Sequence, residues 1–515
     1  MESYYLTTAI DYVNSRPHIG TAFEKIAADA VARYMRLRGK DTFFSMGNDE
    51  HSLNVEREAR RLGLDPQEYC DKMAGEFESI WSLLDLSYDR FVRTTEEAHA
   101  KAVEEIFRRI ERKGDVYKGF YRGLYCVSCE TFYQEKDLVD GKCPTHLREP
   151  EEIEEENYFF SLTKYREPLL DHIAKNPEFI LPEIRRNEIV SVLETGLVDV
   201  SVSRSSQGWG IPLPADPKHV VYVWFDALIN YLTSVGFPED GKTYGRYWPA
   251  DLHVIGKDIT RFHCIIWPAM LMSAGVPLPK TVYAHGFISV EGRKLSKSLG
   301  NVVDPQAMVE RFGADSVRYY LLREVSFERD GDFSVGQLIG RHNADLANDL
   351  GNLLNRVAGM SRKYLGEGVF PAFEAGEDDD VLRSLAEDVC GRYAAAMDRF
   401  EFHNALAAAW ELVRRGNQYI EENAPWALVK DPEKAGRLGT VLYNVTEALR
   451  IVSVLIAPVM PKKAEELSAA LGLPRRAADF RFDEDIPWRA GAADGRALRV
   501  ERPLFPRIDE EVEAS

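Results

Sequence analysis

The chain has 515 residues, a length that suggests about three or four domains. With 45% hydrophobic and 29% charged residues, it is not a disordered chain, a collagen-like repeat or a small disulfide-stapled scaffold. Its 64 basic and 83 acidic residues give a net charge of −19. This charge alone argues against a polyanion partner, because nucleic acids are usually held by clustered Lys and Arg.

No apolar stretch is long enough for a membrane-spanning helix. The longest clear one covers about residues 451–460, whereas a span needs about 20 residues. The first residues lack the basic and apolar regions of a signal peptide. Three of the 6 cysteines cluster between residues 126 and 143. We therefore expect a cytoplasmic protein whose cysteine cluster binds a metal rather than forming disulfides.

The first half of the chain alternates between strand and helix patterns. The β-prone runs cover residues 4–10 and 42–46, and a helical pattern covers residues 21–40 between them. Thr94 with Glu97 forms a capping box, which predicts a helix to about residue 113. This order indicates a parallel, doubly wound sheet, whose first half we place in residues 1–116.

Residues 117–213 interrupt this alternation. They contain the cysteine cluster, an acidic run and several short strand patterns, so we expect an insertion into the sheet domain. The alternation resumes in residues 214–290, which predicts the second half of the sheet. The strands expected there are 220–224, 252–256 and 282–287, and the helices are 227–233 and 262–274.

Strand patterns become rare after about residue 341. The long amphipathic segments that follow cover residues 345–364, 380–400, 403–422 and 435–456. They predict an all-α helical bundle over residues 341–515, with residues 291–340 as the connection to the sheet domain.

The segment Pro17-His18-Ile19-Gly20-Thr21 lies between a predicted strand and a predicted helix. A ligand crevice opens at such a place in a doubly wound sheet, and the helix N-terminus favours phosphate. There the imidazole can donate a hydrogen bond to a phosphate oxygen, and the glycine would let an adenine ring or ribose lie close to the backbone. A capped loop with an incidental histidine is the alternative.

A second segment, residues 292–301, places Lys294, Ser296 and Lys297 in a Gly- and Ser-rich loop. Two lysines three positions apart can neutralise charge that builds on a leaving pyrophosphate. An ordinary solvated basic turn is the alternative. Together with His18 in the other half of the sheet, the loop indicates a nucleotide site.

These two segments resemble the HIGH and KMSKS motifs of the class I aminoacyl-tRNA synthetases, which flank ATP in a Rossmann-type domain. The resemblance narrows to the methionyl-tRNA synthetases and runs from about residue 4 to residue 506. The stretches that narrow it are 9–14, 47–51, 222–227, 256–259, 262–263 and 424–426.

The resemblance implies that the chain activates methionine with ATP, accompanied by Mg²⁺, to methionyl-adenylate. The resemblance also implies that the chain then transfers methionine to the 3′ end of tRNA(Met), for initiation and elongation of protein synthesis. Positioning and charge stabilisation would dominate the catalysis, with His18, Lys294 and Lys297 as catalytic residues. The ATP-binding residues implied are His18, Gly20, Thr21, Gly256, Asp258, Lys294, Ser296 and Lys297.

A methionine pocket must recognise an uncharged thioether by shape and polarizable aromatic contacts. The family's pocket positions correspond to Ile10, Tyr12, Trp224, Leu228, Tyr231, Ile259, Phe262 and His263. Asp49 matches the carboxylate that receives the substrate ammonium, and Arg204 matches an arginine at the substrate end of the site. Core packing is the alternative for each pocket residue, and a surface arginine is the alternative for Arg204.

Cys126 and Cys129 are followed, after thirteen residues, by Cys143 and His146. Two close pairs of soft ligands suit tetrahedral Zn²⁺, and four protein ligands indicate a structural metal. Free cysteines are the alternative. The family's insertion carries such a zinc knuckle.

In the family the helical bundle reads the anticodon, and residues 291–340 would hold the lysine loop and contact the tRNA stem. Asn352 and Arg356 can hydrogen-bond splayed bases, while Trp426 supplies a stacking plane. The alternatives are a helix cap, a solvated arginine and a buried tryptophan. The chain ends soon after residue 507, without the OB-fold domain that dimerises many relatives, so we expect a monomer.

Thr21 departs from the family pattern, because it stands where the second His of HIGH is found. A threonine is shorter and cannot become cationic, so a water or a neighbour takes over, or the site is weaker. Asn48, Ser52 and Leu295 are smaller departures. An acidic surface suppresses non-specific binding, so a tRNA should touch a few basic strips, such as residues 108–122.

Three other functions compete with this prediction. A synthetase for leucine, isoleucine or valine would usually carry an editing insertion larger than about 100 residues, and one for cysteine would hold zinc in its active site. A small-molecule nucleotidyltransferase would be much shorter. A zinc-bearing RNA-binding protein with an inactive site would not consume ATP.

Overall fold

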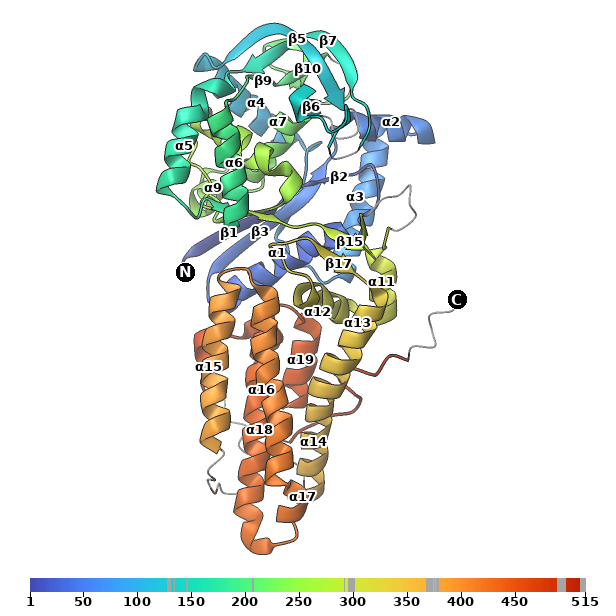
Figure 1. Ribbon diagram of the computed structural model, residues 1–515, viewed down its shortest axis with the longest axis vertical. Helices are drawn as coiled ribbons and strands as arrows, with labels where there is room; N and C mark the ends of the chain where they lie inside the picture. The colour runs from blue at the N-terminus through green and yellow to red at the C-terminus, as the bar shows by residue number, and fades with distance from the viewer. Residues whose placement is uncertain are drawn as a thin grey trace.

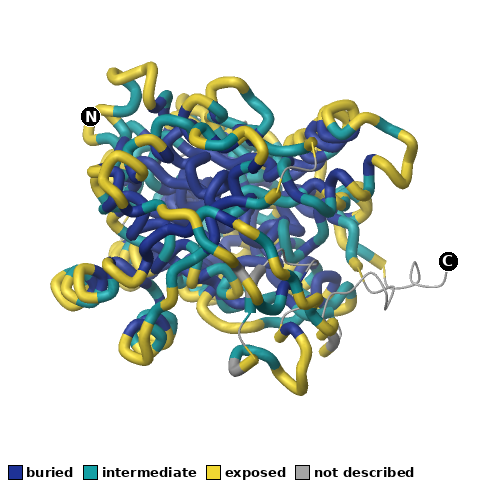
Figure 2. Tube along the Cα trace, turned by 90° about the horizontal axis from the view of Figure 1, so that it is seen from above, coloured by how far each residue is buried: buried dark blue, intermediate teal, exposed yellow. Residues whose placement is uncertain are grey.

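The structure is a computed structural model that describes residues 1–126, 131–133, 135–144, 147–205, 208–290, 292–294, 302–366, 374, 376, 379–488 and 497–509. The molecule is elongated, with the parallel sheet and the inserted strands at one end and the helical bundle at the other (Figure 1). Seen from above, buried backbone fills the centre and exposed segments form the rim (Figure 2).

The predicted parallel sheet is confirmed. Its strand order is β2-β3-β1-β13-β14-β8, and β4 also pairs with β3. The strands are β1 (Ser3–Thr8), β2 (Asp11–Tyr12), β3 (Asp41–Asp49), β4 (Arg90–Arg93), β8 (Ile180–Leu181), β13 (Leu252–Gly256) and β14 (Val282–His285). β1 pairs in parallel with β3 on one side and with β13 on the other. A crevice is expected beyond the C-terminal ends of β1 and β13, where the two halves of the sheet meet.

Helices cover this sheet. They are α1 (Ile19–Leu37), α2 (Leu53–Leu62), α3 (Pro66–Leu83), α4 (Glu97–Arg112), α7 (Val223–Leu228), α8 (Asn230–Thr233), α9 (Gly241–Tyr247) and α10 (Trp267–Ala274). The crossover helix α1 joins β1 to β3 and is buried along most of its length.

Between β4 and β13 the chain builds a second layer of short strands. These are β5 (Val116–Cys126), β6 (Thr131–Tyr133), β7 (Glu151–Phe160), β9 (Val200–Ser201), β10 (Ser203–Ser205), β11 (Pro212–Leu213) and β12 (Asp216–Val221). Two helices, α5 (Arg166–Lys175) and α6 (Glu183–Thr195), flank β8. β5 and β7 form a long antiparallel pair, whereas β8 leaves this layer and pairs with β14 of the main sheet.

The segment after β14 forms a small sheet, in which β15 (Ile288–Val290) lies between β16 (Arg293–Lys294) and β17 (Gly331–Phe333). The helices α11 (Pro305–Phe312), α12 (Ala314–Glu324) and α13 (Val335–Arg341) lead from it to the bundle.

The predicted helical C-terminal region is also confirmed. Its helices are α14 (Asn352–Leu365), α15 (Asp379–Met397), α16 (Phe402–Asn423), α17 (Pro425–Leu428), α18 (Ala435–Ile456), α19 (Pro461–Ala470) and α20 (Phe482–Asp485). Pro432–Ile456 is long and apolar enough to cross a membrane, but its apolar window is completely buried inside the bundle, as in a core helix.

Two local predictions were wrong. The strand predicted at 220–224 ends at Val221, and α7 begins at Val223, so Trp224 is helical. The capping box is absent, because α4 is preceded by Glu96, and the Thr94 hydroxyl instead accepts the N–H of Glu50 at 2.9 Å.

Candidate active site

His18 is the N-cap of α1, at the C-terminal end of the β1–β2 segment. Its Nδ1 accepts the backbone N–H of Thr21 at 3.2 Å and lies 3.3 Å from the Thr21 hydroxyl. Because Nδ1 is an acceptor, the proton of the neutral ring lies on Nε2, which is the donor that a phosphate oxygen requires. Thr21 thus helps to orient the histidine, and Gly20 lies beside it in the first turn of α1.

The segments at the two ends of the predicted lysine loop are described, and one of them is held at this helix start. Lys294 lies in β16, paired with Ser289, although its side chain and the residues Ser296 and Lys297 lie outside the described part. After the loop, the carbonyl of Val303 accepts the N–H of Ile19 at 3.0 Å. The structure therefore holds the segment that directly follows the second motif against the N-terminus of α1.

Arg16 adds a second link between the two segments. Its guanidinium pairs with Asp304 at 3.4 Å and donates to Gln306 at 2.8 Å. The predicted residue Gly256 ends β13, the strand next to β1, and Asp258 lies in the turn that follows. A Cβ on Gly256 would lie 2.7 Å from the Asp258 carboxylate, so a larger residue here would displace that carboxylate.

Aromatic side chains from three segments meet at the predicted methionine pocket. Trp224 stacks on Phe262 with ring centroids 4.0 Å apart, and Tyr12 meets Trp224 edge-on at 6.0 Å. Leu228 and Tyr231 are buried, whereas Ile10 and Ile259 are partly exposed. Phe262 and His263 lie in a π-helical turn, Phe262–Ile266, an irregularity that is frequent at functional sites.

His263 is held as a neutral ring. Its Nδ1 donates to the carbonyl of Ile259 at 3.0 Å, so its Nε2 accepts the hydroxyl of Tyr231 at 2.6 Å. Burial lowers the pKa of His263 to about 4. The deep part of the pocket is thus polar but uncharged, which suits a thioether.

Asp49 and Arg204 lie in different parts of the molecule. Asp49 ends β3 beside Tyr12, and only 3% of it is exposed. Arg204 lies in β10, where it pairs with Glu155 at 2.7 Å and covers the Tyr125 ring at 4.3 Å. Asp49 therefore adjoins a predicted pocket residue, whereas the contacts shown for Arg204 are to the inserted strands.

The sequence analysis missed a buried carboxylate that ties the pocket together. Each carboxylate oxygen of Asp226, in α7, pairs with one imidazole. Oδ2 lies 2.7 Å from Nδ1 of His51, and Oδ1 lies 2.6 Å from Nε2 of His99. Burial opposes its charge, but the two imidazoles outweigh burial and hold the pKa of Asp226 below its ordinary value. The pairing of His51 with Asp226 links the segment after Asp49 to α7, the helix that carries Trp224. An acidic residue within the apolar run 222–229 was the available signal.

A second missed cluster centres on Lys25 in α1, whose ammonium group is completely buried. It donates to the carbonyl of Ala9 at 2.7 Å and to Glu24 at 2.7 Å, and it lies 3.1 Å from Asp11. The other Glu24 oxygen lies 3.0 Å from the His285 ring. Charged residues within the apolar pattern of α1 were the signal for this cluster.

Of the four predicted zinc ligands, the structure describes Cys126 and Cys143, and both are buried. Cys126 ends β5 opposite Thr131 of β6. The carbonyl of Cys143 accepts the N–H of Leu147 at 2.8 Å. Cys129 and His146 lie outside the described residues, and the described residues alone contain no metal-binding group.

The predicted anticodon residues lie on the bundle. Asn352 is exposed at the start of α14, and Arg356 pairs with Glu421 of α16 at 2.5 Å. Trp426 is 40% exposed in α17, which lies at the end of the bundle far from the sheet (Figure 1).

Comparison with known proteins identifies the family. The model of class I tRNA synthetases (M) matches residues 4–152 and 145–358, and that of the anticodon binding domain of methionyl tRNA ligase matches residues 370–515. A protein named methionine–tRNA ligase, from Caldanaerobacter subterraneus, is 47% identical over 514 residues, covering 99% of this chain and 80% of that protein. The chain belongs to the methionine–tRNA ligases. It is therefore an enzyme, an aminoacyl-tRNA ligase of class I, and the predicted family is confirmed.

Solved structures agree with this family. A Mycobacterium tuberculosis methionyl-tRNA synthetase in complex with methionyl-adenylate superposes with a TM-score of 0.92 at 42% identity, covering 98% of this chain and 100% of that chain. The apo form of the same enzyme superposes with a TM-score of 0.84 at 40% identity, covering 99% of each chain. The arrangement of this chain is thus nearer to the adenylate-bound one.

Proposed function

We propose that the crevice beyond β1 and β13 activates methionine with ATP and then charges the 3′ end of tRNA(Met). The contact between Ile19 and Val303 supports this proposal, because Val303 lies two residues after the predicted lysine loop and Ile19 opens α1, where phosphate would bind. ATP–pyrophosphate exchange with each amino acid tests it. Methionine should stimulate exchange strongly, and exchange driven by isoleucine or cysteine instead would refute the methionine assignment.

In the first step the methionine carboxylate attacks the α-phosphate of ATP, and pyrophosphate leaves. Nε2 of His18 and the N–H groups at the start of α1 bind phosphate oxygens, while Lys294 and Lys297 offset the charge on pyrophosphate. The phosphate oxygens of ATP would be ligands of Mg²⁺, which would offset their charge. Gly20, Thr21, Gly256, Asp258 and Ser296 complete the nucleotide site.

The amino acid is recognised at both of its ends. The buried carboxylate of Asp49 pairs with the substrate ammonium group, while the aromatic rings and the neutral His263 surround the thioether. The role of Arg204 at the substrate end stays a prediction. In the second step a ribose hydroxyl of the terminal adenosine attacks the activated carbonyl, and AMP leaves.

Cys126, Cys129, Cys143 and His146 would hold one structural zinc ion. The ion would fix the knuckle, which is too small to fold on a core of its own. Metal analysis of the purified protein should find one zinc per chain. Cys143→Ser should remove it, whereas Cys70→Ser, at a buried cysteine of α3, should retain it.

Asn352, Arg356 and Trp426 would read the anticodon. The pairing of Arg356 with Glu421 ties α14 to the end of α16, just before Trp426. A monomeric state and a cytoplasmic location also stay predictions, and light scattering of the purified protein tests the first.

A further inference from the structure

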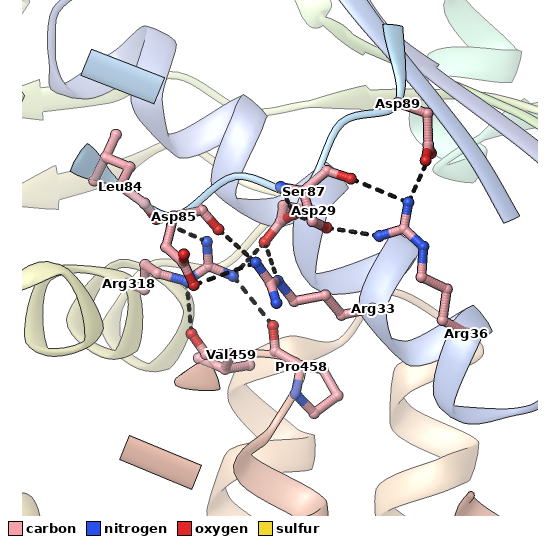
Figure 3. Close-up of polar contacts among 10 residues, drawn as sticks. All are labelled: Asp29, Arg33, Arg36, Leu84, Asp85, Ser87, Asp89, Arg318, Pro458 and Val459. Carbon is pink, nitrogen blue, oxygen red and sulfur yellow. Dashed lines mark hydrogen bonds and ion pairs between the residues drawn. The ribbon is translucent and has the colours of Figure 1, made fainter. Parts of the chain in front are cut away.

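A buried ion pair joins the sheet domain to the bundle. Nη2 of Arg318, in α12, donates to Oδ2 of Asp29, in α1, at 2.6 Å (Figure 3). Both side chains are completely buried. Two buried charges are tolerated only when their remaining hydrogen-bonding groups are satisfied, so the surroundings of this pair decide what it does.

The other donors of Arg318 hold the bundle and the segment after α3. Nε donates to the carbonyl of Val459 at 2.7 Å, Nη2 also donates to that of Pro458 at 3.2 Å, and Nη1 donates to that of Leu84 at 3.1 Å (Figure 3). Pro458 and Val459 follow α18, the buried helix of the bundle. The planar guanidinium therefore fixes three segments at one point.

Asp29 is equally well fixed. Its carboxylate also accepts Nε of Arg33 at 2.8 Å and both the N–H and the hydroxyl of Ser87, at 2.7 and 2.6 Å. Burial opposes the charge, but Arg33 and Arg318 outweigh burial and hold the pKa of Asp29 well below its ordinary value. The pair is thus ionised, and it cannot relax toward other partners.

The helices that meet here lead to both catalytic motifs. α1 begins at His18, and its 19 residues span about 28 Å at 1.5 Å per residue. α12 follows α11, which starts directly after the segment that contacts Ile19. At the other end of α1, the Tyr34 hydroxyl donates to Asp398, just after α15, at 3.2 Å. A shift of α18 would therefore reach α1 and α12 together.

We propose that Arg318 is a positioning residue that couples anticodon recognition in the bundle to the catalytic end of α1. This rests on the proposed anticodon role of the bundle. Binding of the cognate anticodon biases the position of α18, and Arg318 transmits that bias, so that only the cognate tRNA sets the site for transfer. Activation of methionine without tRNA does not need this signal, because Lys25 and Val303 hold the start of α1.

Arg318→Lys tests the coupling, because a lysine keeps the charge but has only three N–H donors, on one nitrogen, for the four acceptors that the planar guanidinium holds. Two quantities are measured on the full chain. The first is the rate of pyrophosphate exchange without tRNA. The second is the anticodon preference, which is the ratio of kcat/KM for aminoacylation of a tRNA(Met) transcript to that for the same transcript with a changed anticodon. We expect exchange close to the wild-type rate and an anticodon preference, in kcat/KM, reduced about tenfold.

Arg246→Lys is the matched control. Arg246 lies in α9 and donates to Asp41 of β3 at 2.6 Å, within the sheet domain and away from Asp29, so its loss should change neither quantity. Asp29→Asn, which keeps the size of the side chain, should repeat the effect of Arg318→Lys and serves if the latter does not fold.

An unchanged anticodon preference in the folded variants would overturn the proposal, as would equal losses of exchange and aminoacylation. If the wild-type enzyme itself showed no anticodon preference, the proposed anticodon role of the bundle would be refuted. The coupling proposal, which rests on that role, would then be refuted as well.

Discussion

At the scale of single residues, Lys25 shows how a buried charge shapes the amino-acid pocket. It lies one turn after Thr21 on α1, and all its acceptors are internal. Two of its partners, Ala9 and Asp11, flank the predicted pocket residue Ile10. The ammonium group therefore fixes the bend between β1 and β2 that presents the pocket.

Lys25→Met should raise the KM for methionine in pyrophosphate exchange and leave the KM for ATP nearly unchanged. Because the change leaves buried carboxylates unpaired, we expect the free energy of unfolding to fall by about 3–5 kcal/mol. Urea denaturation measures this loss. Lys101→Met removes an exposed ion pair and should cost less than about 1 kcal/mol. An unchanged KM for methionine in the Lys25 variant would contradict the positioning role.

His263 predicts a pH dependence. Burial lowers its pKa from 6.5 to about 4 in the folded protein, so below pH 6.5 the unfolded chain binds a proton that the folded chain does not. The stabilisation is complete above pH 6.5 and is lost as the pH falls toward 4. Between pH 7 and pH 5 the wild type should lose about 2 kcal/mol more than His263→Gln. Urea denaturation at both pH values checks this, and parallel losses would contradict it.

At the scale of elements, the helices and strands with a regular hydrophobic period could be predicted from the sequence, whereas the irregular segments could not. The helix predicted at 21–40 is α1, Ile19–Leu37, and the strand at 252–256 is β13. The β-branched run around Val220 favours a strand locally, yet α7 starts at Val223 because tertiary contacts outweigh propensity. One such contact joins Asp226 to His51 and His99, which lie far away in sequence. The π-helical turn at Phe262 has no local signal either.

The lysine loop carries a prediction at this scale. If the loop stabilises the leaving pyrophosphate, Lys297→Ala should lower the rate of pyrophosphate exchange by about 10²–10³-fold while methionine binding stays nearly constant. Exchange kinetics and equilibrium binding of methionine measure the two effects. Lys280→Ala, at an exposed lysine paired with Asp251, is the control and should change neither. Full exchange activity in the Lys297 variant would refute the role of the loop.

At the scale of the whole molecule, the site depends on distant parts of the chain. The pocket residues that the resemblance to the family predicts are spread along the chain from Ile10 to His263. The structure brings the rings of Tyr12, Trp224 and Phe262 together. The buried pair of Asp29 with Arg318 could not be predicted, because its two residues lie 289 positions apart in the sequence. The net charge of −19 likewise says little about where a tRNA binds.

Trp426 tests whether the far end of the bundle contributes to catalysis on tRNA. Stacking of a base on an aromatic ring is worth about 1–3 kcal/mol, so Trp426→Ala should lower kcat/KM for aminoacylation by about 5–150-fold. Pyrophosphate exchange should not change, because α17 lies at the opposite end of the molecule from the sheet (Figure 1). Val429→Ala removes a neighbouring side chain that is 39% exposed and should have little effect. If Trp426→Ala instead lowered exchange and aminoacylation equally, the tryptophan would support folding rather than anticodon binding.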